Sequence, residues 1–414
     1  MASTHADASR RAGATTLVGA LFVVSLALRP QLTAIGPLIP GIREELAASY
    51  GFLGLLTAIP VLCMGIFALV GPSVAGWFGN RAGIALSVGV LVASGILRAV
   101  APGAELVLLA TFGIGVGTAV IGPILAMFVR DRMPSQLVGG TSAYAGGTNV
   151  GAAIGAAVAV PLALALGGWR ESLLAISLAT IGCLVAWLAV VRPTVRRTPD
   201  GSVAPRVRRL ELPRLPLRRP VAWAIGILFG LQSWLYYGQT AWLASIYIER
   251  GWDPGAAAVL VSLVSLASMV AIVLAPWGAR RGLTRRTMLT GAAAASLTGL
   301  VGIAALGGGA LLWALLLGAG LGMMFTLLLT LPTDISEHAR DVGGTAALML
   351  LVGYLGASVA PTVLGAVRDA TGDFATSIWV LVAVAAVMIP LSWSLTPHRL
   401  RPSRTPVEVP GEDS

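Results

Sequence analysis

Long apolar stretches recur along this chain, and they decide what it can fold into. Twelve stretches of about 20 residues or more are separated by shorter polar segments. An apolar helix of that length crosses the hydrocarbon core of a bilayer, where a helix satisfies its backbone hydrogen bonds internally. The sequence therefore predicts an all-α polytopic membrane protein with twelve transmembrane helices, at roughly 16–40, 51–76, 82–101, 104–128, 136–165, 170–191, 220–247, 255–277, 286–306, 309–331, 342–367 and 373–395.

Arginine supplies all 28 basic residues of the chain. Most of the arginines gather before the first span, after the last span and in alternate loops between spans, which places them on one side of the membrane. The opposite side has only Arg43, Arg170, Arg250 and Arg368, each with an acidic residue close by. The positive-inside rule then predicts that both termini are cytoplasmic and that the protein lies in the cytoplasmic (inner) membrane. The Arg-rich segment 192–219 is interpreted as a cytoplasmic linker beside anionic membrane lipids, and not as a nucleic-acid-binding arm.

An internal repeat divides the predicted spans into two sets of six. The tetrapeptide VGGT occurs at 138–141 and at 342–345, and Pro72 and Pro276 are the same distance apart in the sequence. Two six-span halves in parallel repeat are the architecture of the major facilitator transporters, whose substrate site lies near the membrane midplane between the halves. The predicted units are a tail at 1–15, a six-helix half at 16–191, the linker at 192–219, a six-helix half at 220–396 and a tail at 397–414.

Arg29 is the first candidate for a functional residue. It lies about 12 residues into the first span, close to mid-membrane at 1.5 Å per residue, and no carboxylate in that apolar span can pair with it. A charge at that depth costs about 2.5–3.5 kcal/mol even on the mildest scale, which marks a functional site. Pro30 predicts a bent or unwound backbone here, which a membrane protein tolerates where the backbone lines a cavity. Arg29 is either a bidentate anion clamp or a structural residue that binds helix carbonyls.

Other polar side chains fall at the depth of Arg29. The seventh span contains LQSWLYYGQTAW at 231–242, whose amides and phenols can hydrogen-bond a small polar solute or another helix. Arg98, near the outer end of the third span, is interpreted as a snorkelling residue, with anion guidance at the outer mouth as the alternative. The candidate solute-binding residues from this reasoning are Arg29, Asn149, Gln232, Tyr236, Tyr237 and Tyr354.

Several kinds of chemistry are excluded by what the sequence lacks. No Asp or Glu falls in the middle of a predicted span, which argues against efflux of cations and leaves no side-chain proton carrier in the membrane. Cys63 and Cys183 lie within apolar spans and are expected to be free thiols. The sequence contains no HExxH or GxSxG motif and no lysine, so we expect neither an enzyme nor a bound cofactor or metal.

The chain resembles the cyanate and nitroimidazole permease branch of the major facilitator superfamily. The resemblance covers essentially all twelve spans and is most specific at ALRPQLTAIGPLIPGIREEL (27–46), LLTAIPVLCMG (55–65), VRDRMP (129–134) and LQSWLYYGQTAWL (231–243). It implies transport of a small anionic or polar solute across the inner membrane. It also implies that Arg29, Gln232, Tyr237 and Trp242 line the cavity. One departure is Asn80-Arg81-Ala82-Gly83, where the superfamily usually has an acidic residue before the arginine.

The leading hypothesis is a twelve-span secondary active or facilitative transporter of a small anion or compact polar solute, similar in kind to cyanate. Alternating access would expose Arg29 to each side in turn, and nothing in the sequence demands more than a monomer. The alternative is an efflux transporter for drug-like or nitroaromatic compounds, whose activity would depend little on Arg29. A sensor without transport activity would need a folded output domain, and the polar linker and tails are too short to supply one.

Overall fold

The computed structural model describes residues 15–192, 215–306, 308–336 and 339–395 of the 414-residue chain. The expected tail 397–414, most of the expected tail 1–15 and residues 193–214 of the expected linker lie outside these ranges. Within them the regular elements are helices. They are a first helix over 15–26, α2 (Pro30–Thr33), α3 (Ile35–Leu46), α4 (Tyr50–Phe67), η1 (Ala68–Val70), α5 (Gly71–Phe78), α6 (Asn80–Val100), α7 (Ala104–Arg132), η2 (Pro134–Gln136), α8 (Leu137–Leu166), α9 (Trp169–Val190), α10 (Pro220–Glu249), α11 (Pro254–Arg280), α12 (Arg285–Ala305), α13 (Ala310–Ile335), α14 (Ala339–Ser358), α15 (Ala360–Thr371) and α16 (Ala375–Ser394).

The predicted all-α membrane fold is confirmed. Eleven helical segments of the described chain are long and apolar enough to cross a membrane. The remaining predicted span corresponds to α10, which has 30 residues and is long enough to cross, but carries the polar run that begins at Gln232. Its lower hydropathy has a structural reason, because the polar residues Gln232, Ser233, Gln239 and Thr240 of this helix are all buried inside the protein.

Three of the predicted spans are interrupted rather than continuous. The first breaks at residues 27–29, directly before Pro30, and then continues as α2 and α3. The second passes through η1 before α5, which has Pro72 in its first turn, and the eleventh divides into α14 and α15 just before Pro361. Proline lacks the N–H that would continue the ladder of helix hydrogen bonds. The break before Pro30 agrees with the unwound backbone predicted there, and the breaks near Pro72 and Pro361 were not predicted.

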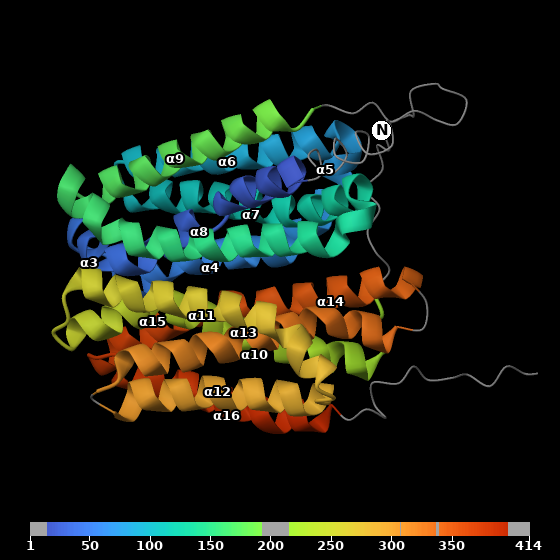
Figure 1. Ribbon diagram of the computed structural model, residues 1–414. Coiled ribbons are helices and arrows are strands. Elements are labelled where there is room, and N and C mark those ends of the chain that lie inside the picture. The colour runs from blue at the N-terminus through green and yellow to red at the C-terminus, as the bar shows by residue number, and fades with distance from the viewer. Residues whose placement is uncertain (1–14, 193–214, 307, 337–338, 396–414) are drawn as a thin grey trace, which may run out of the picture.

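The helices form two bundles that lie side by side (Figure 1). The first bundle contains the elements from the first helix to α9, and the second contains α10 to α16. Within the first bundle, glycines bring α8 against the broken first span, since a Cβ at Gly151 would lie 2.4 Å from the carbonyl oxygen of Leu26 and one at Gly155 would lie 2.4 Å from the Cα of Pro30. Glycine spaced by four residues is typical of such close contacts between membrane helices.

The two ends of the molecule differ in how the bundles meet. We call the end where α9 finishes and α10 begins the linker face, and the other end, where α3 meets α4, the opposite face (Figure 1). At the opposite face the bundles touch along a seam. A Cβ at Gly36 of α3 would lie 2.5 Å from the Thr240 carbonyl oxygen of α10, and one at Gly54 of α4 would lie 2.5 Å from the Pro361 carbonyl oxygen of α15. The bundles are therefore closed against each other on this side.

A carboxylate strengthens this seam. Asp369 of α15 accepts hydrogen bonds from the backbone N–H groups of Tyr50 (3.1 Å) and Gly51 (2.8 Å), which begin α4 in the other bundle. Ser49 accepts a further bond from the N–H of Phe52. The first N–H groups of a helix have no partner within the helix and carry the positive end of its dipole. Asp369 therefore joins the two bundles through a charge and two hydrogen bonds.

Asp369→Asn is expected to weaken closure of the opposite face by about 0.5–1 kcal/mol, because the side chain loses the charge that interacts with the start of α4. The effect is small because the contact is exposed to solvent. The measurement is the labelling of a cysteine introduced at Thr240, which is buried beneath the seam, by a membrane-impermeant maleimide added at this face. We expect the labelling rate to rise about twofold to fivefold. Asp373→Asn is the matched control, because the Asp373 carboxylate accepts a bond from Ala375 N–H within its own bundle. Equal rates in the two variants would contradict a role for Asp369 in closure.

Candidate solute-binding cavity

A cavity of about 350 Å³ lies between the two bundles. Its first-bundle wall is formed by Leu28, Arg29, Met64, Thr118, Gly122, Thr141, Tyr144, Ala145, Thr148 and Asn149. Its second-bundle wall is formed by Gln232, Ser233, Tyr236, Tyr237, Ser268, Ile272, Leu321, Gly322, Phe325, Thr326, Leu329, Thr330 and Tyr354. Thr141, Ile272 and Thr330 belong to the linker-face halves of their helices. The cavity thus extends toward the linker face and stops below the closed seam.

Arg29 enters the cavity at the break in the first span. Its backbone, at φ −113° and ψ −25°, forms the N-cap of the four-residue helix α2. The Arg29 carbonyl oxygen accepts bonds from the N–H groups of Leu32 (2.9 Å) and Thr33 (3.0 Å). The Thr33 hydroxyl also donates to the Ala152 carbonyl of α8 at 2.8 Å. The unwound segment therefore has bonded partners on its own bundle, and the Arg29 side chain is left to face the second bundle.

The guanidinium of Arg29 meets aromatic side chains rather than a carboxylate. Its Nη1 donates to the Tyr237 hydroxyl at 2.9 Å, and its central carbon lies 5.8 Å and 5.7 Å from the ring centroids of Tyr236 and Tyr237. Such rings attract a cation electrostatically. Among the described residues no Asp or Glu forms an ion pair with Arg29. Of the residues that line the cavity, Arg29 alone is charged, so the cavity has a net positive potential.

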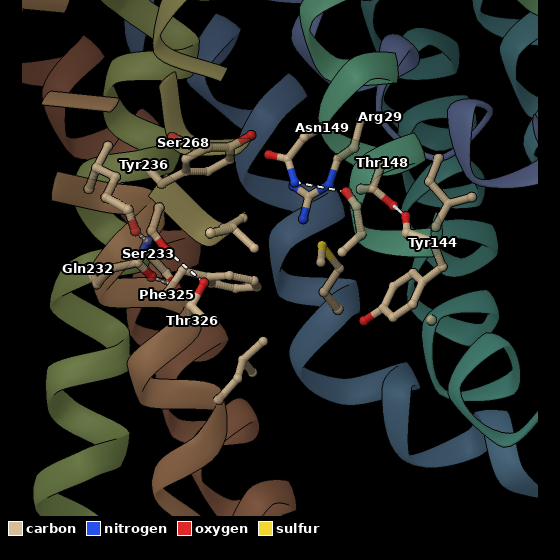
Figure 2. Close-up of a pocket in the computed structure, with 18 of the residues that line it drawn as sticks. Arg29, Tyr144, Thr148, Asn149, Gln232, Ser233, Tyr236, Ser268, Phe325 and Thr326 are labelled. Atoms are coloured by element: carbon tan, nitrogen blue, oxygen red, sulfur yellow. Dashed lines mark hydrogen bonds between the residues drawn. The ribbon is translucent and has the colours of Figure 1, made fainter. Parts of the chain in front are cut away.

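Amide groups complete the polar part of the cavity (Figure 2). Asn149 lies beside Arg29 and donates to the Ala145 carbonyl at 2.9 Å, so its side-chain oxygen faces the cavity without a protein donor among the described residues. Across the cavity, the Gln232 side chain donates to the Leu321 carbonyl at 3.3 Å and accepts from the Ser233 hydroxyl at 3.2 Å. The first-bundle wall thus presents the Arg29 donors and one free amide acceptor, and the second-bundle wall presents mainly aromatic surface and hydroxyl groups.

The structure brings six of the seven predicted site residues together around this cavity: Arg29, Asn149, Gln232, Tyr236, Tyr237 and Tyr354. Trp242 lies elsewhere. Its ring is fully buried in the seam, where the indole N–H donates to the Pro361 carbonyl at 2.8 Å and the ring packs against Tyr50 and Phe374. Trp242 is five residues beyond Tyr237 on a straight helix, about 7.5 Å nearer the opposite face. The expectation that it lines the cavity is corrected accordingly.

The interpretation of Arg98 as a snorkelling residue is wrong. Its side chain is only 1% exposed, and it donates to the Gln31 backbone oxygen at 2.9 Å and to the Gln31 side-chain oxygen at 2.6 Å. The physical reason lies in the direction of α6. Helical side chains lean toward the N-terminus of their helix, and the N-terminus of α6 is at the linker face. The long Arg98 side chain therefore runs inward, away from the near membrane surface.

The sequence reasoning missed the hydroxyl groups of the second-bundle wall. Ser268, Thr326 and Thr330 line the cavity, and Thr326 and Thr330 are four residues apart on one face of α13. That spacing of polar residues in an apolar span was the available signal. The Thr326 and Thr330 hydroxyls donate to carbonyls of α13, and the Ser268 hydroxyl has the carbonyls of Val264 in α11 and Gly318 in α13 as acceptors, each at 2.8 Å. These bonds direct the hydrogens to backbone carbonyls and leave the hydroxyl oxygens as acceptors.

The comparison with protein families agrees with this architecture. The family model described as Major Facilitator Superfamily matches residues 19–361. The chain belongs to the major facilitator superfamily. The D-xylose–proton symporter structure has the same fold, with a TM-score of 0.71 at 16% identity, over 93% of this chain and 98% of the symporter. The protein is therefore a membrane transporter and not an enzyme.

Three relatives align along nearly the whole length of the transporter. An uncharacterized transporter, YycB, of Bacillus subtilis is 31% identical and aligns over 90% of this chain and 91% of its own. The cyanate transport protein CynX of Escherichia coli is 29% identical, over 89% and 93%. The 2-nitroimidazole transporter of Escherichia coli is 27% identical, over 90% and 93%. The expected resemblance to the cyanate and nitroimidazole permeases is thereby confirmed.

In the described part of the chain, the side-chain hydrogen bonds of the loop that departs from the superfamily pattern go to its own bundle. Asn80 donates to the Asp131 carboxylate at 3.1 Å, and Arg81 donates to the backbone carbonyls of Leu188 and Val191. These partners are in α7 and at the end of α9. A carboxylate that does join the two bundles, Asp369, is on the opposite face.

Proposed function

We propose that this transporter carries a small anion or compact polar solute and that Arg29 is the central solute clamp. The observation that carries the proposal is a guanidinium that enters the cavity between the bundles without a carboxylate partner among the described residues. One N–H group is engaged by Tyr237, and guanidinium has five N–H donors in a planar fork. An anion such as cyanate matches that fork in charge, a nitro group matches it in shape, and a carboxylate matches it in both.

The remaining walls supply the other contacts that such a solute needs. The rings of Tyr236, Tyr237 and Tyr354 provide flat apolar surface, and the free oxygen of Asn149 accepts a hydrogen bond from a solute N–H. The names of two relatives, a cyanate and a 2-nitroimidazole transporter, agree with solutes of this kind. Both solutes are small and carry electron-rich atoms, cyanate as a linear anion and 2-nitroimidazole as a planar ring.

The closed seam and the cavity together support alternating access. Arg29 belongs to the first bundle and its partner Tyr237 to the second, so a solute between them contacts both moving parts. Rocking of the bundles would open the seam and close the linker face. We place the linker face in the cytoplasm because the arginines gather there, which puts both termini inside the cell. A monomer suffices for this cycle, since the cavity is built from one chain.

The means of coupling follows from the lining residues. Among the described residues that line the cavity there is no Asp, Glu or His. A side-chain proton relay of the usual kind therefore has no carrier at this site. We propose uniport, exchange, or movement of a proton carried by the solute itself.

Efflux of a neutral drug-like or nitroaromatic compound is the second candidate function. It is favoured by the cavity volume of about 350 Å³, which falls in the range typical of larger ligands, and by apolar lining residues such as Phe325, Leu28 and Ile272. In that case the apolar walls would provide most of the binding energy, and removal of the Arg29 charge would change transport little.

A solute panel in proteoliposomes separates the two functions. The purified protein is tested for uptake of ¹⁴C-cyanate, of 2-nitroimidazole and of neutral lipophilic dyes, each with the parent protein and with Arg29→Gln. We expect uptake of cyanate or 2-nitroimidazole by the parent and a large loss in Arg29→Gln. Movement of the neutral dyes alone, at equal rates in both proteins, would support efflux and reject the anion clamp.

A further inference from the structure

Arg98 is a buried cation that takes no direct part in the proposed solute clamp. Its side chain is 1% exposed, no carboxylate among the described residues pairs with it, and its Nε has no hydrogen-bond partner. It does not line the central cavity. A buried charge of this kind costs more than an apolar side chain of similar volume, so packing does not account for arginine at this position.

Both hydrogen bonds of Arg98 go to one residue. The Nη2 group of Arg98 donates to the backbone oxygen of Gln31 and to its side-chain oxygen. The Gln31 side-chain nitrogen in turn donates to the Ser177 hydroxyl of α9 at 2.8 Å, and Ser177 donates to the Leu173 carbonyl at 2.7 Å. The backbone and side-chain oxygens of Gln31 are therefore bonded to Arg98 of α6, and its side-chain nitrogen is bonded to Ser177 of α9.

Gln31 and Ser177 pack closely against Gly95 of α6. A Cβ at Gly95 of α6 would lie 2.5 Å from the Ser177 hydroxyl oxygen and 3.0 Å from the Gln31 side-chain nitrogen. Gln31 itself is fully buried. The three side chains Arg98, Gln31 and Ser177 form a continuous polar chain that passes behind the broken segment, on the side away from the cavity.

Gln31 lies two residues after Arg29, inside the four-residue helix α2. α2 is separated from α3 by Ala34 alone, which keeps right-handed helical angles (φ −68°, ψ −23°), so α3 supports the C-terminal end of α2. At its N-terminal end the chain is broken at residues 27–29, and the position of α2 there depends on its side-chain anchors, which are Gln31 on one side and the bond from Thr33 to Ala152 on the other. Since Arg29 is the N-cap of α2, the anchor at Gln31 fixes where the Arg29 guanidinium enters the cavity.

We propose that Arg98 is a positioning residue, which holds Gln31 and thereby sets the geometry of Arg29 toward the solute. The inference rests on the proposed function of Arg29 as the clamp. It assigns Arg98 no contact with the solute. Loss of Arg98 weakens solute binding through misplacement of Arg29, and it has no further effect where the Arg29 clamp has already been impaired.

A double-mutant cycle between Arg98 and Arg29 tests this. Uptake of ¹⁴C-cyanate, or of 2-nitroimidazole where the parent prefers it, is measured in proteoliposomes for the parent, Arg98→Met, Arg29→Lys and the double variant. We expect Arg98→Met to raise KM about tenfold with little change in kcat, because mutations of coupled residues are not additive. In the Arg29→Lys protein the same substitution should raise KM less than twofold. Arg98→Lys, which keeps the charge and an N–H donor group on a shorter side chain, should recover part of the loss.

The other outcomes are equally informative. An equal rise in KM in both backgrounds, or a loss explained entirely by less folded protein in the membrane, would overturn the positioning role. Should Arg98→Met fail to fold, Gln31→Leu and Ser177→Ala break the same chain of bonds with less change in charge, and the same cycle is run with them. Transport that is insensitive to Arg29→Lys and Arg29→Ala rejects the clamp itself. Transport that needs Arg29 but not Arg98 rejects only the positioning role.

Discussion

Arg29→Ala is expected to lower solute uptake about 100-fold or more. Two hydrogen bonds from a guanidinium to an anionic or polar solute contribute about 1.5–3 kcal/mol each, and about 1.4 kcal/mol corresponds to a factor of ten. The cavity has no other charged residue to replace them. Initial rates of ¹⁴C-cyanate and 2-nitroimidazole uptake in proteoliposomes measure the effect. The loss should fall mainly on binding, because the seam contacts of Gly36, Gly54 and Asp369 do not involve the Arg29 side chain.

Two further variants make this result specific. Arg29→Lys keeps the charge but loses the planar fork, so we expect a loss between those of the parent and of alanine. Arg130→Ala removes an exposed arginine at the linker face, outside the cavity, and should transport as the parent does. Uptake by Arg29→Ala at the parent rate, with equal amounts of folded protein, would reject the proposed clamp.

The features that the sequence predicted well are those that depend on local chemistry. The length of the apolar stretches predicted the spans, and Pro30 predicted the interruption at 27–29 in the first span. Residue counts along each span predicted that Arg29, Asn149 and Tyr237 lie at one depth in the membrane, because a helix rises by a fixed length per residue. The structure adds that these side chains face one another, which depth alone does not require.

The errors arise where direction matters as well as depth. Trp242 belongs to the polar segment of α10 but lies about 7.5 Å nearer the opposite face than Tyr237 does. It is therefore at the level of the seam and not of the cavity. Arg98 lies near the C-terminal end of α6, yet its side chain points back along the helix to Gln31. The Asp369 contact with α4 joins segments far apart in the chain, and nothing in the local sequence around Asp369 indicates such a partner.

Gly54→Val is expected to abolish closure of the opposite face and with it most transport. A Cβ at Gly54 would lie within 2.7 Å of backbone atoms of Pro361 and Thr362 in the other bundle. Backbone cannot move aside as the end of a flexible side chain can. An overpacked contact costs about 1–3 kcal/mol, so the closed state should become up to about 100-fold less populated. Uptake should fall by a similar factor, while solute added at the opposite face can still bind.

Cysteine labelling distinguishes this mechanism from general loss of folding. With Cys63 and Cys183 replaced by serine, a cysteine at Thr240 should react slowly with an impermeant maleimide in the parent, because Thr240 is buried against Gly36. In Gly54→Val the reaction should be fast. Gly182→Val is the matched control, since nothing lies within 4 Å of a Cβ there and Gly182 is exposed. Slow labelling together with lost transport in Gly54→Val would mean that the seam still closes, and the close approach of α4 to α15 would then not be what gates the opposite face.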